Sequence, residues 1–167
     1  MLDSMRLLSQ CMLFSGLSEE QLAELYGITS KRCCRRGAVI FREAEAGIGF
    51  YIIASGKVKV FKTSPEGKEQ ILHIFGPGEP IGEVPVFHGQ PYPANAAALS
   101  EAELYFFPRQ RFVALLEKNS SLALNMLAVL AMRLRRFATQ IEHLTLREVP
   151  GRRQPRSEER RVGKECR

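Results

Sequence analysis

The chain has 167 residues, with 24 lysines and arginines against 18 acidic residues, and a formal net charge of +6. A hydrophobic content of 45% is that of a globular protein, which excludes global disorder, and the length suits one domain with an appendage. The longest apolar runs, such as residues 50–54, are far shorter than the roughly 20 residues that cross a bilayer. Residues 1–6 lack the basic and apolar regions of a secretory signal, so we expect a cytoplasmic protein without membrane association.

The excess positive charge is concentrated at the C-terminal end of the chain. Residues 156–167 look like the translation of a common short-read sequencing adapter, and they show no hydrophobic period. Without them the net charge falls to +4 and three cysteines remain, Cys11, Cys33 and Cys34. Their odd number and their spacing argue against a disulfide framework and against a zinc or iron–sulfur site.

The first predicted helix opens with a capping box, in which Ser18 is followed by Gln21, and it ends at Gly27. From Gly37 to Pro108 the pattern changes to short β-rich runs separated by glycines, which predicts a small sandwich or barrel. The predicted strands are 38–41, 50–54, 57–62, 70–75, 94–99 and 103–107.

Two short segments beside these strands have their own signatures. Residues 64–67 read Ser-Pro-Glu-Gly, the preferred chemistry of a type I turn between two predicted strands. Residues 31–36 are a basic run that could touch DNA phosphates. We favour its interpretation as a solvated turn that enters the first strand.

After Pro108 the apolar period becomes helical. A short helix is predicted over 109–119, with Pro108 placed to start it. Ser120 or Ser121 then caps a long helix that continues to about Arg147 and that Pro150-Gly151 ends.

The long helix carries an apolar seam whose spacings alternate between three and four residues, which is the heptad pattern of a coiled coil. A wider apolar stripe would favour packing on the β domain instead, and Met126 and Val129 do widen it. We favour a parallel homodimer. The predicted interface residues are Leu127, Leu130, Leu134, Phe137, Ile141 and Leu144.

Several of these segments resemble the effector half of the Crp/Fnr transcription regulators. Residues 51–60 look like that family's strand–glycine–strand signature, 64–72 resemble its next hairpin, and 78–83 its entry to the phosphate-binding cassette. The resemblance covers roughly residues 10–149. It implies a mainly β fold with flanking helices, a double-stranded β-helix jelly roll, followed by a long dimerisation helix and a C-terminal helix-turn-helix. We expect that DNA-binding module to be missing from residues 150–167.

In cyclic-nucleotide-binding members of this family, the resemblance implies a Gly-Glu pair for the ribose and an Arg followed by Ser/Thr for the cyclic phosphate. Gly82 and Glu83 match the first pair, but residues 91–95 offer neither Arg nor Ser/Thr, and no Arg or Lys lies between Lys68 and Arg109. A buried phosphate needs a fixed cation, so we expect no tight cyclic AMP binding. The candidate effector-pocket residues are Gly82, Glu83, Val84, Tyr92, Pro93, Ala94 and Asn95.

The degenerate cassette and the start of the long helix are similar to the haem-dependent, nitric-oxide-sensing branch of the family. Haem iron needs an axial His, Cys or Met beside an apolar slot. The candidates are His73, His88 and His143, although each is more simply interpreted as a surface or hydrogen-bonded histidine. Haem therefore stays a candidate cofactor, and no other metal site is predicted.

No catalytic motif is present, which argues against an enzyme. We expect residues 1–119 to form the sensing jelly roll, 120–149 the dimer helix and 150–167 an unstructured tail. The favoured interpretation is the sensory and dimerisation half of a regulator, which takes a small-molecule or gas effector and reaches DNA only through its missing module. The alternative is a stand-alone ligand-binding or dimerisation module.

Overall fold

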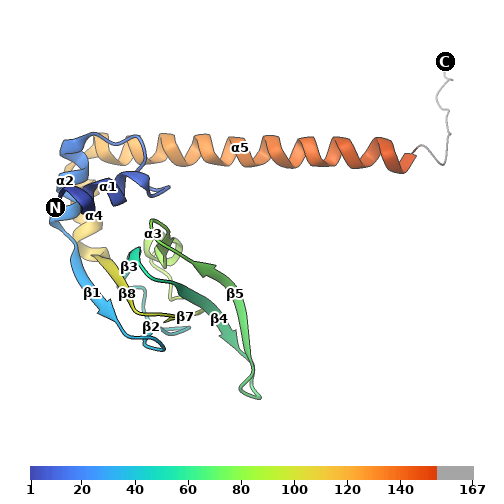
Figure 1. Cartoon of the computed structure of the whole chain (residues 1–167). Helices are drawn as coiled ribbons and strands as arrows, with labels where there is room; N and C mark the ends of the chain where they lie inside the picture. The colour runs from blue at the N-terminus through green and yellow to red at the C-terminus, as the bar shows by residue number, and fades with distance from the viewer. Residues whose placement is uncertain (154–167) are drawn as a thin grey trace. The chain divides into compact units, whose positions relative to one another are not determined.

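The computed structural model describes residues 1–153, so the adapter-like segment 156–167 lies outside the described residues. The chain divides into two compact units between Val129 and Leu130. The first unit holds every strand of the described residues, as well as helices α1 to α4 and the beginning of α5 (Figure 1).

Within residues 1–153, eight strands form two four-stranded sheets, and every pairing is antiparallel. One sheet has the order β1-β8-β3-β6 and the other β2-β7-β4-β5, which confirms the predicted jelly roll. The strands are β1 (Ser30–Cys34), β2 (Val39–Phe41), β3 (Gly49–Ser55), β4 (Val58–Thr63), β5 (Glu69–Phe75), β6 (Pro80–Ile81), β7 (Asn95–Ala98) and β8 (Ala102–Pro108).

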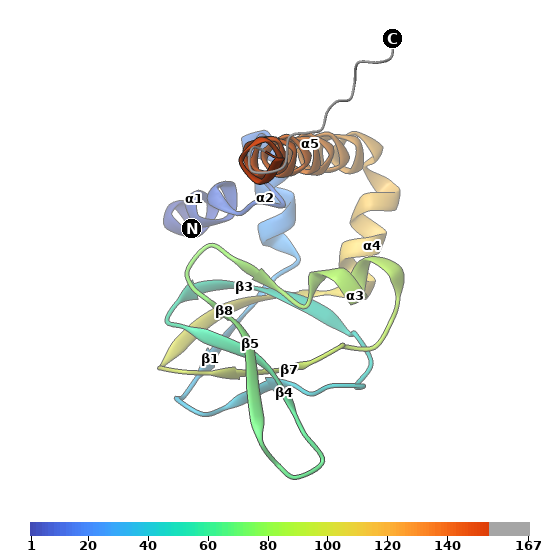
Figure 2. The same cartoon turned by 90° about the vertical axis from the view of Figure 1, so that its right-hand side faces the viewer.

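The helices of the first unit lie on one side of the strands in both views of the chain (Figures 1 and 2). They are α1 (Leu2–Gln10), α2 (Glu19–Gly27), α3 (Glu83–His88) and α4 (Arg109–Lys118), and α5 (Ser120–Arg153) follows. The capping box of α2 is confirmed, since the Ser18 side chain accepts from the Gln21 N–H while the Gln21 side chain accepts from the Ser18 N–H. Within residues 1–153, no single helix is long and apolar enough to cross a membrane, and one bent pair, 109–118 with 120–146, meets that test by length and composition alone.

Strand β3 is buried on both faces, which explains why its sequence is a continuous apolar run rather than an alternating one. Phe50 faces the helices, where its ring stacks on Phe107 at 4.6 Å between centroids and meets Phe112 edge-on at 5.0 Å. Its neighbour Tyr51 belongs to the core between the two sheets. The buried members of that inner core are Phe41, Tyr51, Ile53, Val58, Ile81, Tyr92, Ala96, Leu104 and Phe106.

The predicted turn at 64–67 is confirmed by the hydrogen bond from the Gly67 N–H to the Ser64 carbonyl, at 2.8 Å. Gly67 has a φ of +87°, a left-handed conformation that glycine adopts without a Cβ penalty. The turn joins β4 to β5 in a long hairpin (Figure 2).

The basic run 31–36 is not the predicted turn. Residues 30–34 form β1, which pairs with β8 in the register Ser30 to Phe106 through Cys34 to Ala102. This segment has little intrinsic strand propensity, so its conformation comes from hydrogen bonding to the buried β8 rather than from its own sequence.

The long helix α5 begins where predicted, at Ser120, but its cap is Asn119 rather than a serine. The Asn119 Oδ1 accepts from the Leu122 N–H at 3.2 Å and from the Ser121 hydroxyl at 3.0 Å. The helix continues to Arg153, so the expected stop at 150–151 is wrong. Helix ends are the least sharply specified part of a helix, because the last carbonyls need no intrahelical partner.

Candidate functional site

Gly82 links β6 to α3 in a crowded, left-handed conformation. Its φ is +76°, and a Cβ on it would lie 3.1 Å from a ring carbon of Phe41 and 3.1 Å from one of Tyr92. Both the backbone conformation and the close approach of the two rings therefore favour glycine here. Gly82 thus sets the entry of the cassette directly against two aromatic rings.

Glu83 is the first residue of α3 and is half-buried. Burial raises the pKa of its carboxyl group, and a hydrogen bond from its own backbone N–H lowers that pKa in part. It forms no ion pair with any of the described residues. Without a neighbouring cation, the carboxyl group favours its neutral form more than an exposed glutamate does.

Tyr92 occupies the second half of the cassette and points into the jelly roll. Its side chain is 3% exposed, and its ring stacks on Phe41 with 4.0 Å between centroids and 11° between planes. The hydroxyl donates to the Gly49 carbonyl, while the backbone N–H donates to the Glu45 carbonyl at 2.9 Å. Burial is the main cause that raises the pKa of Tyr92 to about 12, so the hydroxyl stays protonated at neutral pH.

The remaining cassette candidates do not converge on one cavity. Val84 is 58% exposed and Pro93 is exposed, whereas Ala94 is buried. The Asn95 Oδ1 accepts from the Glu43 N–H at 2.8 Å, so its side chain joins the start of β7 to the loop after β2. Of the predicted effector residues, the structure brings Gly82 and Tyr92 together. Both lie against the ring of Phe41 on β2, which is not among the predicted effector residues.

A cation, Arg109, contacts the C-terminal end of α3. The Arg109 Nε donates to the Val86 carbonyl at 2.8 Å, and its guanidinium would lie 3.3 Å from a Cβ on Gly89, the C-cap. A guanidinium satisfies the last carbonyls of a short helix well. The signal for this contact is weak in the sequence, because Arg109 simply begins the next predicted helix.

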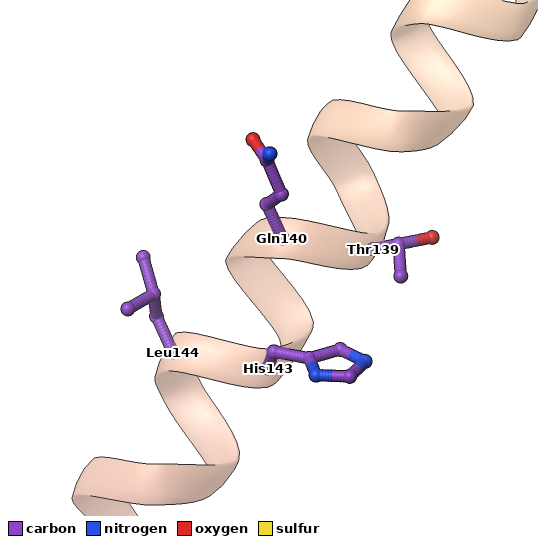
Figure 3. A pocket seen from close by; sticks show the side chains of 4 residues that line it. All are labelled: Thr139, Gln140, His143 and Leu144. Atoms are coloured by element: carbon purple, nitrogen blue, oxygen red, sulfur yellow. The ribbon is translucent and has the colours of Figure 1, made fainter.

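The three histidine candidates for haem are exposed and lie on three different elements. His73 on β5 packs edge-on against Phe75, with 4.4 Å between ring centroids. His88 ends α3, and His143 lines a shallow hollow of about 410 Å³ together with Thr139, Gln140 and Leu144. All four of these residues belong to α5, where Thr139 and His143 point to one side of the helix and Gln140 and Leu144 to the other (Figure 3). None of the three histidines lines an apolar slot in the jelly roll, so the residues present do not fit a histidine-ligated haem.

No group of three or more metal-ligating side chains occurs in the described part of the chain. Cys33 is exposed and Cys34 is half-buried, while Cys11 is buried.

The predicted interface residues of α5 are largely exposed in the chain taken alone. Leu130 is half-buried, and the other five are between 53% and 70% exposed. The most exposed of them is Leu134. Their heptad spacing places them on one side of the helix.

Comparison with known proteins identifies the fold family. The cyclic nucleotide-binding domain family matches residues 31–119. A cyclic AMP receptor protein of Thermus thermophilus is 33% identical over 140 residues, which are 84% of this chain and 65% of that protein. The chain therefore spans about two thirds of the length of this curated relative.

Two solved structures match in domain size as well as in fold. The sensor domain of the transcriptional regulator DNR of Pseudomonas aeruginosa is 34% identical, with a TM-score of 0.66 over 82% of this chain and 92% of that one. The N-terminal domain of a transcriptional regulator of Streptomyces coelicolor is 35% identical, with a TM-score of 0.71 over 78% of this chain and 94% of that one. The family is a regulatory one rather than an enzymatic one. The chain therefore belongs to the cyclic nucleotide-binding domain family and, within it, to the domains of Crp/Fnr regulators.

Proposed function

We propose that this chain is the effector-sensing and dimerisation part of a bacterial Crp/Fnr-type transcription regulator. The jelly roll takes a small-molecule or gas effector, and two copies of α5 pair along the seam of Leu127, Leu130, Leu134, Phe137, Ile141 and Leu144. An effector that binds one arrangement of the pair better than another shifts the population of the two arrangements. A DNA-binding module outside this chain would then read a two-fold site.

The observation that carries this proposal is the exposed seam of α5. Six large apolar side chains follow one another at alternating spacings of three and four residues, and all of them except the half-buried Leu130 are more than half exposed. Such a contiguous apolar stripe marks an interaction surface. Its strict heptad repeat fits a second identical helix better than it fits a flat surface, because only a supercoil keeps a 3.5-residue seam in register.

The cassette supports an effector other than a cyclic nucleotide. The resemblance expects an arginine where this chain has residues 91–95, and the ring of Tyr92 fills the adjoining interior against Phe41. A cyclic phosphate placed beside Gly82 would lose its solvation without gaining a fixed cation. The exposed positions of His73, His88 and His143 likewise give no support to haem.

The coding sequence can test directly whether a DNA-binding module follows this chain. Reading the gene beyond residue 155 should reveal a helix-turn-helix within about sixty codons, since such a motif needs two helices and a short turn. An in-frame stop just beyond residue 155 would contradict a regulator and leave the stand-alone module.

The dimer is tested by charging the seam. Leu134→Glu with Ile141→Glu places four like charges in the paired helices, so we expect a monomer by light scattering where the unchanged protein is a dimer. The matched control is Met132→Glu with Leu146→Glu, which adds the same two charges at exposed positions outside the seam, 59% and 60% exposed. The control should remain a dimer. A dimer of unchanged mass in the seam variant would refute the proposed interface.

A further inference from the structure

At the β1 end of the jelly roll lies a hollow of about 430 Å³. Its lining includes arginines, whereas the cassette residues 82–84 and 91–95 include no cation. Small-molecule sites in proteins commonly occupy about 300–1,000 Å³. Strands β1 and β2, the loop between them and the inner face of β3 and β8 build the hollow. The lining residues that matter here are Arg32, Cys34, Arg35, Ile40, Tyr51 and Leu104.

Arg32 places a positive charge on the inner side of β1. It is directly opposite Leu104 in the β1–β8 register, and directly paired residues share a face of the sheet. Leu104 is fully buried in the inner core, and the Arg32 guanidinium lies 4.5 Å from the ring centroid of Phe106 in the same core. The preceding residue, Lys31, faces the other way and pairs with Glu103 at 3.3 Å.

The charge of the hollow is not neutralised by a protein carboxylate. Within the described residues, neither Arg32 nor Arg35 forms an ion pair. Glu45 is the acidic group that acts on Tyr51, and its side chain already accepts from the Arg42 N–H at 2.9 Å. The hollow is therefore left with two guanidinium groups that have no anionic partner.

Two polar groups of the hollow, the Tyr51 hydroxyl and the Cys34 thiol, are neutral at pH 7. Burial raises the pKa of the Tyr51 hydroxyl, and Arg32 lowers it in part. Burial also raises the pKa of the Cys34 thiol, with a smaller opposing effect of Arg32. An anion that enters meets two cations and two protonated groups, with no buried negative charge to repel it.

A second hollow, of about 450 Å³, shares Cys33, Cys34 and Arg35 but differs in charge. Glu101 and Glu103 line it, so it offers carboxylates where the first hollow offers Arg32. The apolar side chains Ile40 and Leu104 line only the first of the two. The combination of an unpaired cation with an apolar wall is thus specific to the hollow beside Arg32.

We propose that the hollow beside Arg32 binds a small organic monocarboxylate with a flat, apolar body. The carboxylate pairs with the Arg32 guanidinium, with Arg35 as a second cation, and the body lies against Ile40 and the ring of Tyr51. A planar guanidinium fork matches the two oxygens of a carboxylate. This inference adds an effector class and a location to the proposed function, but the binding itself does not depend on the dimer.

Isothermal titration calorimetry with sodium benzoate tests the site in the whole chain. We expect saturable binding to the unchanged protein and at least a tenfold loss of affinity in Arg32→Gln. The matched control is Arg36→Gln, which removes an exposed arginine close by in the chain that does not line the hollow. Its affinity should change less than twofold, and neutral benzamide should bind at least tenfold more weakly than benzoate.

Alkylation of Cys34 gives an independent readout, because its thiol lines the hollow. Benzoate should slow the modification of Cys34 by iodoacetamide in the unchanged protein, as followed by peptide mass, and should have no such effect in Arg32→Gln. Absence of saturable benzoate binding, or equal weakening by Arg32→Gln and Arg36→Gln, would overturn the site. A dimer that fails to bind benzoate would overturn this inference alone, whereas a monomer that binds it would overturn only the proposed dimer.

Discussion

The two ends of the jelly-roll interior differ in what occupies them, although neighbouring strands build both. At the cassette end, Phe41 and Tyr92 stack against Gly82 and fill the space with buried rings. At the β1 end, Arg32 lies beside an open hollow, and its guanidinium lies over the ring of Phe106. Substitutions at the filled end should therefore change stability, while substitutions at the open end should change ligand binding and leave stability almost unchanged.

The largest expected effect is that of Tyr92→Ala. This change removes a buried ring, its stack on Phe41 and the hydrogen bond to Gly49, so the free energy of unfolding should fall by about 3–5 kcal/mol. Urea denaturation followed by circular dichroism measures it. Arg32→Gln at the open end should cost less than about 1 kcal/mol. Equal losses at the two ends would remove the distinction between them.

Alkaline pH should lower the free energy of unfolding through ionisation of the buried Tyr92 hydroxyl at the cassette end. Its folded-state pKa of about 12 is above the ordinary 10.0, so the folded state holds this proton more tightly than the unfolded state does. Its contribution is complete below about pH 10 and is lost as the pH rises through about 12, by about 3 kcal/mol in total. The difference in stability between the unchanged protein and Tyr92→Phe, measured by urea denaturation from pH 8 to 12, isolates this contribution. A difference that does not vary with pH would contradict the buried, protonated hydroxyl.

A smaller expected loss of stability distinguishes the cost of steric crowding at Gly82 from the cost of its left-handed backbone conformation. Gly82→Ala puts a methyl group 3.1 Å from two rings at a positive φ, whereas Gly67→Ala has a positive φ with no atom within 4 Å of the added Cβ. Both should lose about 1 kcal/mol for the left-handed conformation, and Gly82→Ala should lose about 1–2 kcal/mol more. Thermal unfolding of the two variants measures the excess. Identical midpoints would show that Phe41 and Tyr92 yield to the new methyl group.

Most of the fold follows from local patterns. The apolar run of β3, the turn at 64–67 and the capping box at Ser18 each have one dominant local explanation, and all three are found where predicted. Four elements were not predicted. Helix α1 has no side-chain cap, α3 has only six residues, β1 is basic and β6 has only two residues, so the stability of each comes from neighbours distant in the sequence.

The candidate site was harder to predict than the fold. The sequence shows that residues 91–95 lack a cation, but not that the ring of Tyr92 turns inward, because its stacking partner Phe41 lies on a strand far away in the chain. The inward face of Arg32 depends on the register between β1 and β8, which no pattern within 31–36 specifies. A local sequence pattern does not predict contacts that depend on the register between strands distant in the chain.

The basic character of β1 has a further consequence, because β1 is the outermost strand of its sheet. An outermost strand presents unpaired backbone groups that another chain can extend into an aggregate. Lys31 and Arg32 point to opposite faces of that strand, so an identical strand added alongside would bring like charges together on both faces. The positive charge of β1 therefore opposes edge-to-edge pairing between the sheets of two chains.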